Sequence, residues 1–383
     1  MPKVILAANT EWYLYRFRLS LAVFLRQQGF EVVFASPPGP YAESLEQAGF
    51  QWKPWKVGRQ TLSPRGELGA ISSLTDIYRR ERADLVHHFT IKPVLYGSLA
   101  AYLAGVQGIV NSITGLGYVF LQDDLKARIV RQLVKTFYRF IFMSPKSAGI
   151  FENQANLDFF VRSKLVPASR CYLIEGVGVD ADYFAPVPES QAVPIIVLPA
   201  RMLWDKGVGV LVEAARLLHM KNEVRVALVG EPDPGNPATI PVEQLHSWVN
   251  EGVVEWWGWR EDMRAVFRSC HIVTLPSMGE GIPTVLLEAA ACARPIVTTN
   301  TPGCKDVVQH GINGLVVPPN DPEALAEALQ RLILDPGLRG RMGAAGRQIV
   351  LEKYTNDRVN AANLAVYNKV LKRPQDRQIP VNS

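Results

Sequence analysis

Long apolar runs are missing from this sequence, in which no stretch reaches the roughly 18 residues that a bilayer-spanning helix requires. The first residues, MPKVILAANTEWYLYRF, contain one early lysine, but their apolar run ends at Asn9 and no small-residue cleavage site follows. We therefore expect neither a signal peptide nor a transmembrane helix.

Cysteines are few, and Cys171, Cys270, Cys292 and Cys304 show no C-x-x-C spacing. This scatter argues against a zinc site and against a disulfide framework, and it fits a reducing cytoplasm best. Low-complexity segments and internal repeats are absent too. With 48% hydrophobic and 20% charged residues, the composition is that of a globular protein.

Acidic residues are fewer than basic residues only in the first half of the chain. Residues 1–185 carry 21 Lys+Arg against 15 Asp+Glu, or +6, whereas residues 186–383 carry 20 against 21, or −1. The whole basic excess therefore lies in the first half. It predicts an anionic partner there, either a phosphate group or a membrane surface.

Short β-rich apolar runs alternate with helical patterns through both halves of the chain. We predict strands at 3–8, 31–36, 83–89, 108–113 and 148–153, and again at 194–200, 224–230, 253–259, 271–277 and 295–300. This alternation is typical of βαβ units and parallel sheets. The predicted fold class is α/β, with two Rossmann-like, doubly wound domains that face a central cleft.

A segment rich in Pro, Ser and Ala at 176–194 is interpreted as the linker. We place the N-terminal domain at 1–185 and the C-terminal domain at 186–352. A helix at 353–373 is expected to cross back to the N-terminal domain, followed by a tail at 374–383. Because open α/β sheets bind ligands at the carboxyl ends of their strands, we expect the site in the cleft.

Two carboxylates, Glu280 and Glu288, lie eight positions apart around a Gly-Ile-Pro corner. Even in one continuous helix their side chains are about 80° apart, so they do not form a close acid/base pair. With Pro283 as the first helical residue, the N–H groups near residues 281–284 form a seat for a phosphate or a sugar edge. The alternative is one surface Glu and one ordinary helix Glu.

Two cations, Arg201 and Lys206, occupy the loop after the strand 194–200, before a helix that begins near Gly207. Permanent cations at the carboxyl edge of a parallel sheet suit a diphosphate. The alternative is that both are solvated surface cations. The presence of the Glu pair after a later strand of the same domain weakens this alternative.

The stretches ARMLWDKG, VGEPD, EGIPTVLLEAAACARPIV and GINGLVVPPNDPEALAEAL, with the linker GVGVDADYF, resemble family 4 retaining glycosyltransferases of the GT-B fold. The resemblance covers nearly the whole chain, and it makes the C-terminal domain the nucleotide-sugar-binding one. It implies that Arg201 and Lys206 hold the diphosphate, Glu288 the ribose and Glu280 the transferred sugar, and that they act without a cofactor or metal. The donor site implied in this way also includes Glu231, Gly281, Ile282, Pro283 and Thr284.

In the first half, YLYRFRLSLAVFLRQQGFEV, VHHFTIKPVLYGSLAAYLAG and NSITGLGYVF are similar to bacterial transferases that extend lipid-linked saccharides. Among these are N-acetylgalactosaminyltransferases that act on undecaprenyl-diphosphate-bound diacetylbacillosamine. Thr114 stands where many members have a histidine, so His87, in the loop region after another strand, is the candidate catalytic histidine. A structural histidine beside a strand is the alternative. The candidate acceptor-binding residues are Asn9, Arg18, Arg59, His87, Thr90, Lys92 and Thr114, with Arg18 and Arg59 as candidates for contacts to the acceptor phosphates.

The segment 123–143 is interpreted as a helix with a basic edge beside an apolar face. Its cations are Lys126, Arg128, Arg131, Lys135 and Arg139, and its apolar residues are Ile129, Val130, Leu133, Val134, Phe137, Phe140 and Ile141. Such a helix lies on an anionic membrane, or it packs in the core with its cations extended toward water.

The pair Asp180 and Asp182 resembles a D-x-D metal motif, but its place in the linker favours a reading without metal. The sequence thus predicts an enzyme, a peripheral glycosyltransferase on the inner face of the cell membrane. It would move an N-acetylhexosamine from a UDP-sugar to a polyprenyl-diphosphate-linked saccharide, with no nucleic acid as a partner. A non-catalytic sugar-nucleotide-binding subunit and a hydrolysing UDP-sugar epimerase are the alternatives.

Overall fold

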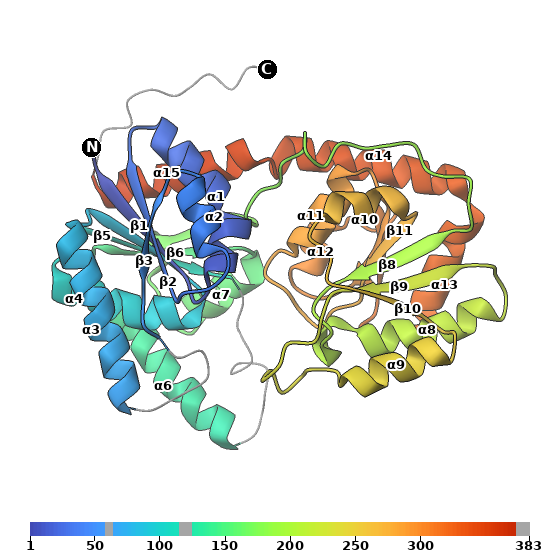
Figure 1. The fold of residues 1–383 in the computed structure, drawn as a ribbon, viewed down its shortest axis with the longest axis horizontal. Helices are drawn as coiled ribbons and strands as arrows, with labels where there is room; N and C mark the ends of the chain where they lie inside the picture. The colour runs from blue at the N-terminus through green and yellow to red at the C-terminus, as the bar shows by residue number, and fades with distance from the viewer. Residues whose placement is uncertain (58–63, 115–124, 373–383) are drawn as a thin grey trace. The chain divides into compact units, whose positions relative to one another are not determined.

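The computed structural model describes residues 1–57, 64–114 and 125–372. The chain divides into two compact units (Figure 1). The first comprises Met1–Glu175 and Asp357–Ser383, and the second comprises Gly176–Asn356. Each unit contains one parallel sheet covered by helices on both faces.

The sheet of the first unit has seven strands in the order β3-β2-β1-β4-β5-β6-β7. They are β1 (Lys3–Ala7), β2 (Glu31–Ser36), β3 (Gln51–Pro54), β4 (Leu85–Phe89), β5 (Gly108–Ile113), β6 (Ser147–Phe151) and β7 (Cys171–Leu173). All pairs are parallel, with Leu6 opposite both Phe34 of β2 and His87 of β4. Because the chain moves outward from β1 in both directions, the sheet is doubly wound, with its switch point between β1 and β4.

Alternating strand residues divide the core of the first unit into two layers. Val4 and Leu6 pack under α1 (Glu11–Gln27) and α15 (Asn356–Val370), while Ile5 and Ala7 pack under α3 (Pro64–Glu81) and α4 (Ser98–Ala104). The short α2 (Ala42–Gln47) adjoins α1, and α6 (Leu125–Ile141) and α7 (Gln154–Arg162) form a third cluster.

The second sheet has six parallel strands in the order β10-β9-β8-β11-β12-β13. They are β8 (Ile195–Pro199), β9 (Arg225–Val229), β10 (Glu255–Gly258), β11 (Ile272–Leu275), β12 (Ile296–Thr299) and β13 (Gly314–Val317). One face carries α8 (Val208–His219), α9 (Val242–Asn250) and α13 (Pro322–Leu334). The other carries α10 (Met263–Ser269), α11 (Thr284–Ala291) and α14 (Pro336–Lys353), with the short α12 (Cys304–Val307) beside β12.

The prediction of two doubly wound parallel α/β domains is confirmed, and each of the ten predicted strands overlaps an observed one. Three edge strands, β3, β7 and β13, are additional. Residues 176–185, which the prediction gave to the first domain, belong to the second unit. There Val179, Ala181 and Phe184 are buried against Phe267 and Val273 in one core cluster.

The predicted C-terminal helix is also divided differently. Lys353 ends α14, and a separate helix, α15, begins at Asn356. Between them, the Tyr354 carbonyl accepts a hydrogen bond from Val179 N, which draws this stretch into the second unit. Of the helices among the described residues, none is long and apolar enough to cross a membrane.

Candidate active site

Lys206 and Glu280 form a close ion pair at the carboxyl edge of the second sheet. Lys206 lies between β8 and α8, and its Nζ donates to the two carboxylate oxygens of Glu280 at 2.6 and 2.8 Å. Both side chains are mostly buried, 16% and 14% exposed. Because β8 and β11 are neighbours in the sheet, the two residues that the sequence assigned to diphosphate and sugar are brought together.

Arg201 is the more exposed cation of the same loop. Its Nη1 lies 2.6 Å from Oδ2 of Asp233, and its side chain is 54% exposed. Asp233 follows β9 in the stretch VGEPD, two residues after Glu231, whose Oε1 accepts from the backbone N–H of Trp259 at 3.1 Å. Asp233 was not among the predicted site residues, although the quoted motif contains it.

Glycines allow the loops at this edge to approach closely. Gly207 has φ +75° and serves as the N-cap of α8. A Cβ at this position would overlap the carbonyl oxygen of Pro276, which follows β11. Gly303 makes a similar approach to the backbone of Gly281. The loops after β8, β11 and β12 are thus held in direct contact.

Hydrogen bonds fix the loop that carries Glu280. Thr301 Oγ1 donates to the Ser277 carbonyl at 3.0 Å, Met278 N to the Asp205 carbonyl at 2.9 Å, and Glu280 N to the Pro302 carbonyl at 3.0 Å. These bonds join the loop after β11 to the loop after β8 and to the loop after β12. The Glu280 carboxylate is therefore held on a backbone with little freedom to move.

Helix α11 begins at Thr284, one residue later than predicted, and Pro283 is its N-cap in an extended conformation. No side chain caps this end of the helix. Ile282 is 5% exposed and Glu288 3% exposed. Ile282 packs in the core cluster of the second unit, so its side chain anchors the loop and faces the core.

In the first unit, Asn9, Thr90 and Thr114 follow β1, β4 and β5. These three strands are neighbours, so the three residues share one edge of the sheet. Lys92 lies just beyond Thr90, and its Nζ is 3.3 Å from Oε1 of Glu67 on α3. The predicted acceptor residues at this edge are thus brought together. Arg59 lies outside the described residues.

His87 does not lie in a loop, as the sequence interpretation held, but inside β4, and it is fully buried. Its Nδ1 is 2.5 Å from the hydroxyl of Tyr367 on α15, and its Nε2 is 2.7 Å from Ser112 Oγ. Burial, the Arg18 charge and His88 hold the pKa of His87 well below its usual range. The ring is a neutral core group in this structure, so direct contact with an acceptor is not supported.

Arg18, another predicted acceptor residue, is 3% exposed. Its guanidinium lies 4.1 Å from the ring centre of Phe89, donates to the Tyr13 hydroxyl at 2.8 Å and is 3.8 Å from the Glu152 carboxylate. The sequence pattern did not reveal this burial, because Phe89 and Glu152 come from distant parts of the chain.

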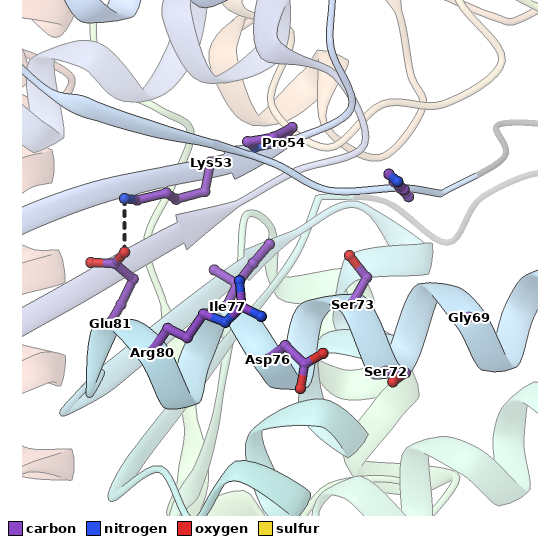
Figure 2. Close-up of a pocket in the computed structure, with 10 residues that line it drawn as sticks. Lys53, Pro54, Gly69, Ser72, Ser73, Asp76, Ile77, Arg80 and Glu81 are labelled. Atoms are coloured by element: carbon purple, nitrogen blue, oxygen red, sulfur yellow. Dashed lines mark ion pairs between the residues drawn. The ribbon is translucent and has the colours of Figure 1, made fainter.

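A hollow of about 540 Å³ opens between β3 and α3 in the first unit (Figure 2). Lys53 and Glu81 form a 2.8 Å ion pair on its wall. The remaining lining residues are Pro54, Lys56, Gly69, Ser72, Ser73, Asp76, Ile77 and Arg80. None of the predicted acceptor residues lines it, so this hollow is distinct from the edge that carries Thr90 and Lys92.

The D-x-D pair forms a turn. Asp180 Oδ1 accepts from the backbone N–H groups of Asp182 and Tyr183 at 3.1 and 2.8 Å. Within residues 1–57, 64–114 and 125–372, no three His, Cys, Asp or Glu side chains are grouped as a metal site would need.

Comparison with known proteins assigns the family. Residues 3–143 match the family described as "Glycosyl transferase 4-like" and residues 193–335 match "Glycosyl transferases group 1". The alpha-maltose-1-phosphate synthase of Mycolicibacterium smegmatis is 31% identical over 78% of this chain and 82% of its own. The chain belongs to the family 4 glycosyltransferases, which have the GT-B fold.

A second relative of this glycosyltransferase comes from Campylobacter jejuni. It is the N,N'-diacetylbacillosaminyl-diphospho-undecaprenol alpha-1,3-N-acetylgalactosaminyltransferase, 28% identical over 94% of this chain and 96% of its own. The crystal structure of Anabaena HepE in complex with UDP and glucose has the same fold. Its TM-score is 0.79 at 18% identity, over 96% of this chain and 100% of that one.

The outer face of α6 in this glycosyltransferase is apolar. Leu133 and Phe140 are 64% and 51% exposed, and Phe137 and Met143 are exposed beside them. Val134, Tyr138 and Ile141 on the opposite face are buried. The buried residues fit the core-packed interpretation, while the exposed residues leave the apolar face that the membrane interpretation requires. The side chains of Lys126, Ile129 and Val130 lie outside what the structure describes.

Two cations of α6 are tied to the unit itself. Lys135 lies 5.7 Å from the ring centre of Phe159, and Arg139 donates to the Ser163 carbonyl at 3.3 Å. Arg128 is exposed. The helix thus presents cations next to the exposed apolar stripe formed by Leu133, Phe137, Phe140 and Met143, which we call the α6 stripe.

Proposed function

We propose that this glycosyltransferase moves an N-acetylhexosamine, such as N-acetylgalactosamine, from its UDP derivative to a polyprenyl-diphosphate-linked saccharide, with retention at the anomeric carbon. The contact that carries the donor part of the proposal is the ion pair between Lys206 and Glu280. Two of the three Nζ protons bond Glu280, and the third remains for a diphosphate oxygen. Glu280 in turn is available to accept from sugar hydroxyls.

At the donor edge, the Glu280 carboxylate is bound by Lys206 and is therefore poorly suited to act as a nucleophile. A substrate-assisted route fits this arrangement. The bond between the anomeric carbon and the UDP oxygen breaks while the acceptor oxygen bonds to the same face of the sugar. The leaving diphosphate takes the acceptor proton, and Arg201 and Lys206 stabilise its growing negative charge.

The lipid-linked acceptor is proposed from two supports. The C. jejuni relative, similar over nearly the full chain, is named for such an acceptor. The α6 stripe and its cations suit a surface that lies on an anionic bilayer. All four cysteines are free thiols, which suits the reducing inner face of the cell membrane.

Transfer assays with individual UDP-sugars and short polyprenyl-diphosphate-linked acceptors test the proposal. We expect UDP release only when acceptor is present, with a UDP-N-acetylhexosamine as the best donor, and product NMR should show a retained anomeric configuration. Lys206→Ala should lower kcat/KM by about 10²–10³, as expected for loss of one preorganised cation. Lys221→Ala, at an exposed lysine of the same unit, is the matched control.

Three results would contradict the proposal in different ways. Acceptor-independent UDP release indicates a hydrolysing epimerase. UDP binding without turnover indicates a sugar-nucleotide-binding subunit. No transfer, together with nucleotide binding by Lys206→Ala and Glu280→Ala equal to that of the wild type, excludes this donor site altogether.

A further inference from the structure

The carboxyl end of β4 gathers buried polar atoms that have no hydrogen-bond partner among the described residues. In the first unit these atoms are Arg18 Nε, Glu67 Oε2 and Thr90 Oγ1. Thr90 directly follows β4, Arg18 stacks on Phe89 at the end of the strand, and Glu67 contacts Lys92 two residues beyond Thr90. Since buried polar groups are normally paired, the unpaired atoms of Glu67 and Thr90 on either side of Lys92 in this region suit a ligand.

The backbone at this point is unusual as well. Thr90 has φ +69°, in the left-handed region that β-branched residues rarely adopt. A π-helical turn, η1 (Pro93–Gly97), follows directly. Both features store strain or weaken regular bonding, and both are frequent at functional sites. At Thr90 the backbone therefore leaves the regular path of β4.

Glu67 contributes the charged group of this cluster. Its Oε1 lies 3.3 Å from Lys92 Nζ, and both side chains are only 18% exposed. The Lys92 ammonium holds the carboxylate in one orientation. Burial, then a side-chain hydrogen bond to Glu67 and the charge of that carboxylate, raise the pKa of Tyr96 on η1, so the Tyr96 hydroxyl also contacts Glu67.

The chemistry of these atoms selects the ligand. A carboxylate oxygen can only accept a hydrogen bond, so Glu67 Oε2 needs an O–H or N–H donor. A phosphate oxygen would be repelled by it. Thr90 Oγ1 can donate as well as accept. The pair therefore suits the hydroxyl groups or the acetamido N–H of a sugar, not its diphosphate.

We propose that Glu67 and Thr90 bind the acceptor sugar through a hydroxyl or acetamido N–H and determine which acceptor sugar is used. Lys92 acts as the positioning residue that holds the Glu67 carboxylate. This inference rests on the proposed function, because it assumes a saccharide acceptor. It adds Glu67, which lies on α3 some distance in sequence from the predicted acceptor motifs.

Acceptor analogues test the inference in the full chain. Wild type, Glu67→Gln and Thr90→Ser are compared on short polyprenyl-diphosphate-linked N-acetylhexosamines and on analogues in which one hydroxyl, or the acetamido group, is replaced by hydrogen. Wild type should prefer the complete sugar over one analogue by at least tenfold in kcat/KM. In Glu67→Gln this preference should fall toward one, with acceptor KM raised about tenfold and UDP affinity unchanged. Thr90→Ser, which keeps the hydroxyl, should retain the preference.

Asp76→Asn changes an exposed carboxylate on the same helix and is the control. Glu67→Gln with a lower melting temperature but an unchanged preference among analogues means that Glu67 is only structural, and it overturns the inference. Unchanged KM and preference overturn it too. Loss of affinity for the free diphosphate moiety instead would assign the site to phosphate. If the wild type transfers sugar to none of the acceptors, the proposed function is wrong, and this inference is wrong with it.

Discussion

The consecutive histidines His87 and His88 point to opposite faces of β4, as alternating strand residues must. His87 meets Tyr367 of α15, and His88 meets Tyr78 of α3 through Nε2 at 2.9 Å. The Nδ1 of His88 donates to Asn111 Oδ1 at 2.8 Å, which also accepts from Ser98. With Nδ1 as the donor, Nε2 accepts from the Tyr78 hydroxyl. Both rings are thus bound as neutral groups inside the first unit.

The buried His88 ring should make stability depend on pH. Burial lowers the pKa of His88 to about 4, while a hydrogen bond to Asn111 opposes the shift. The unfolded chain binds this proton near pH 6.5. Below that pH the unfolded state therefore takes up more protons, and the free energy of unfolding decreases as pH falls from 6.5 toward 4. We expect this ring alone to contribute a loss of about 1–2 kcal/mol between pH 6.5 and 5, measured by urea unfolding as the difference between the wild type and a variant without it.

His88→Gln should have a shallower pH dependence than the wild type over the same range, although it is less stable at pH 7. His246→Gln, at an exposed histidine, should leave the dependence unchanged. If the free energy of unfolding of the wild type is the same at pH 6.5 and pH 5, the conclusion that His88 is buried as a neutral ring is wrong.

At this scale the sequence predicted the location of those residues whose neighbours are close in the chain or in the next βα loop. Arg201, Lys206 and Glu280 lie in the predicted strand-to-helix loops, and the structure joins the last two. His87 could not be assigned in this way. Its partner Tyr367 is 280 residues away, and no local pattern shows that α15 will cover the strand.

At the scale of elements, the junction between β8 and α8 depends on Gly207. Gly207→Ala should destabilise the second unit more than Gly252→Ala. Both glycines have a left-handed φ, +75° and +72°, but only Gly207 faces a carbonyl oxygen, that of Pro276. Gly252→Ala should cost about 1 kcal/mol in unfolding free energy from the backbone conformation alone.

For Gly207→Ala we expect an additional cost of about 1–3 kcal/mol, because the loop has to move away from Pro276. UDP affinity should fall as well, since this shift separates Lys206 from Glu280. Urea unfolding and calorimetric UDP titration measure the two effects. Equal stability of the two variants would show that the close approach is not important.

The α6 stripe should act as a membrane-binding surface. Leu133→Ser with Phe140→Ser should reduce flotation with anionic liposomes at both low and high salt, because it removes exposed apolar area. Arg128→Gln with Arg139→Gln should reduce it mainly at low salt, by roughly tenfold to thirtyfold, at about 1 kcal/mol per cation. Met220→Ser, at an exposed apolar residue of the second unit, is the control. Absence of the wild type from the lipid fraction at both salt concentrations counts against the surface.

The strands that sequence analysis missed share a physical cause. β3 and β7 are the edges of the first sheet, and β13 is an edge of the second. β7 has three residues and β3 has four, with both end residues of β3 exposed. Such short edge strands lack the continuous apolar run of a strand buried on both faces. The four residues of β13 lie in a stretch of sequence rich in Gly and Pro, which hides the strand pattern.

At the scale of the whole molecule, the two units differ in how the chain builds them. The second unit is one continuous segment, Gly176–Asn356, whereas the first is completed only by the last helix. On α15, Val359, Val366 and Tyr367 are buried in the core under β1, β4 and α1. The sequence predicted that a C-terminal helix crosses back to the first domain. It could not predict which residues this helix buries, because they depend on the grooves between distant strands.

A chain that ends at Asn356 should therefore lose the first unit and keep the second. Removing three buried side chains of α15 costs roughly 5–9 kcal/mol of burial free energy, which is comparable to the total stability of a domain. Calorimetry should show one remaining unfolding transition, and UDP titration should show binding retained by the second unit. Tyr367→Phe keeps the apolar ring and removes only the hydroxyl that bonds His87. It should lower stability by about 1 kcal/mol and preserve both transitions. If the truncated chain also preserves both, α15 is dispensable and its buried residues do not hold the first unit together.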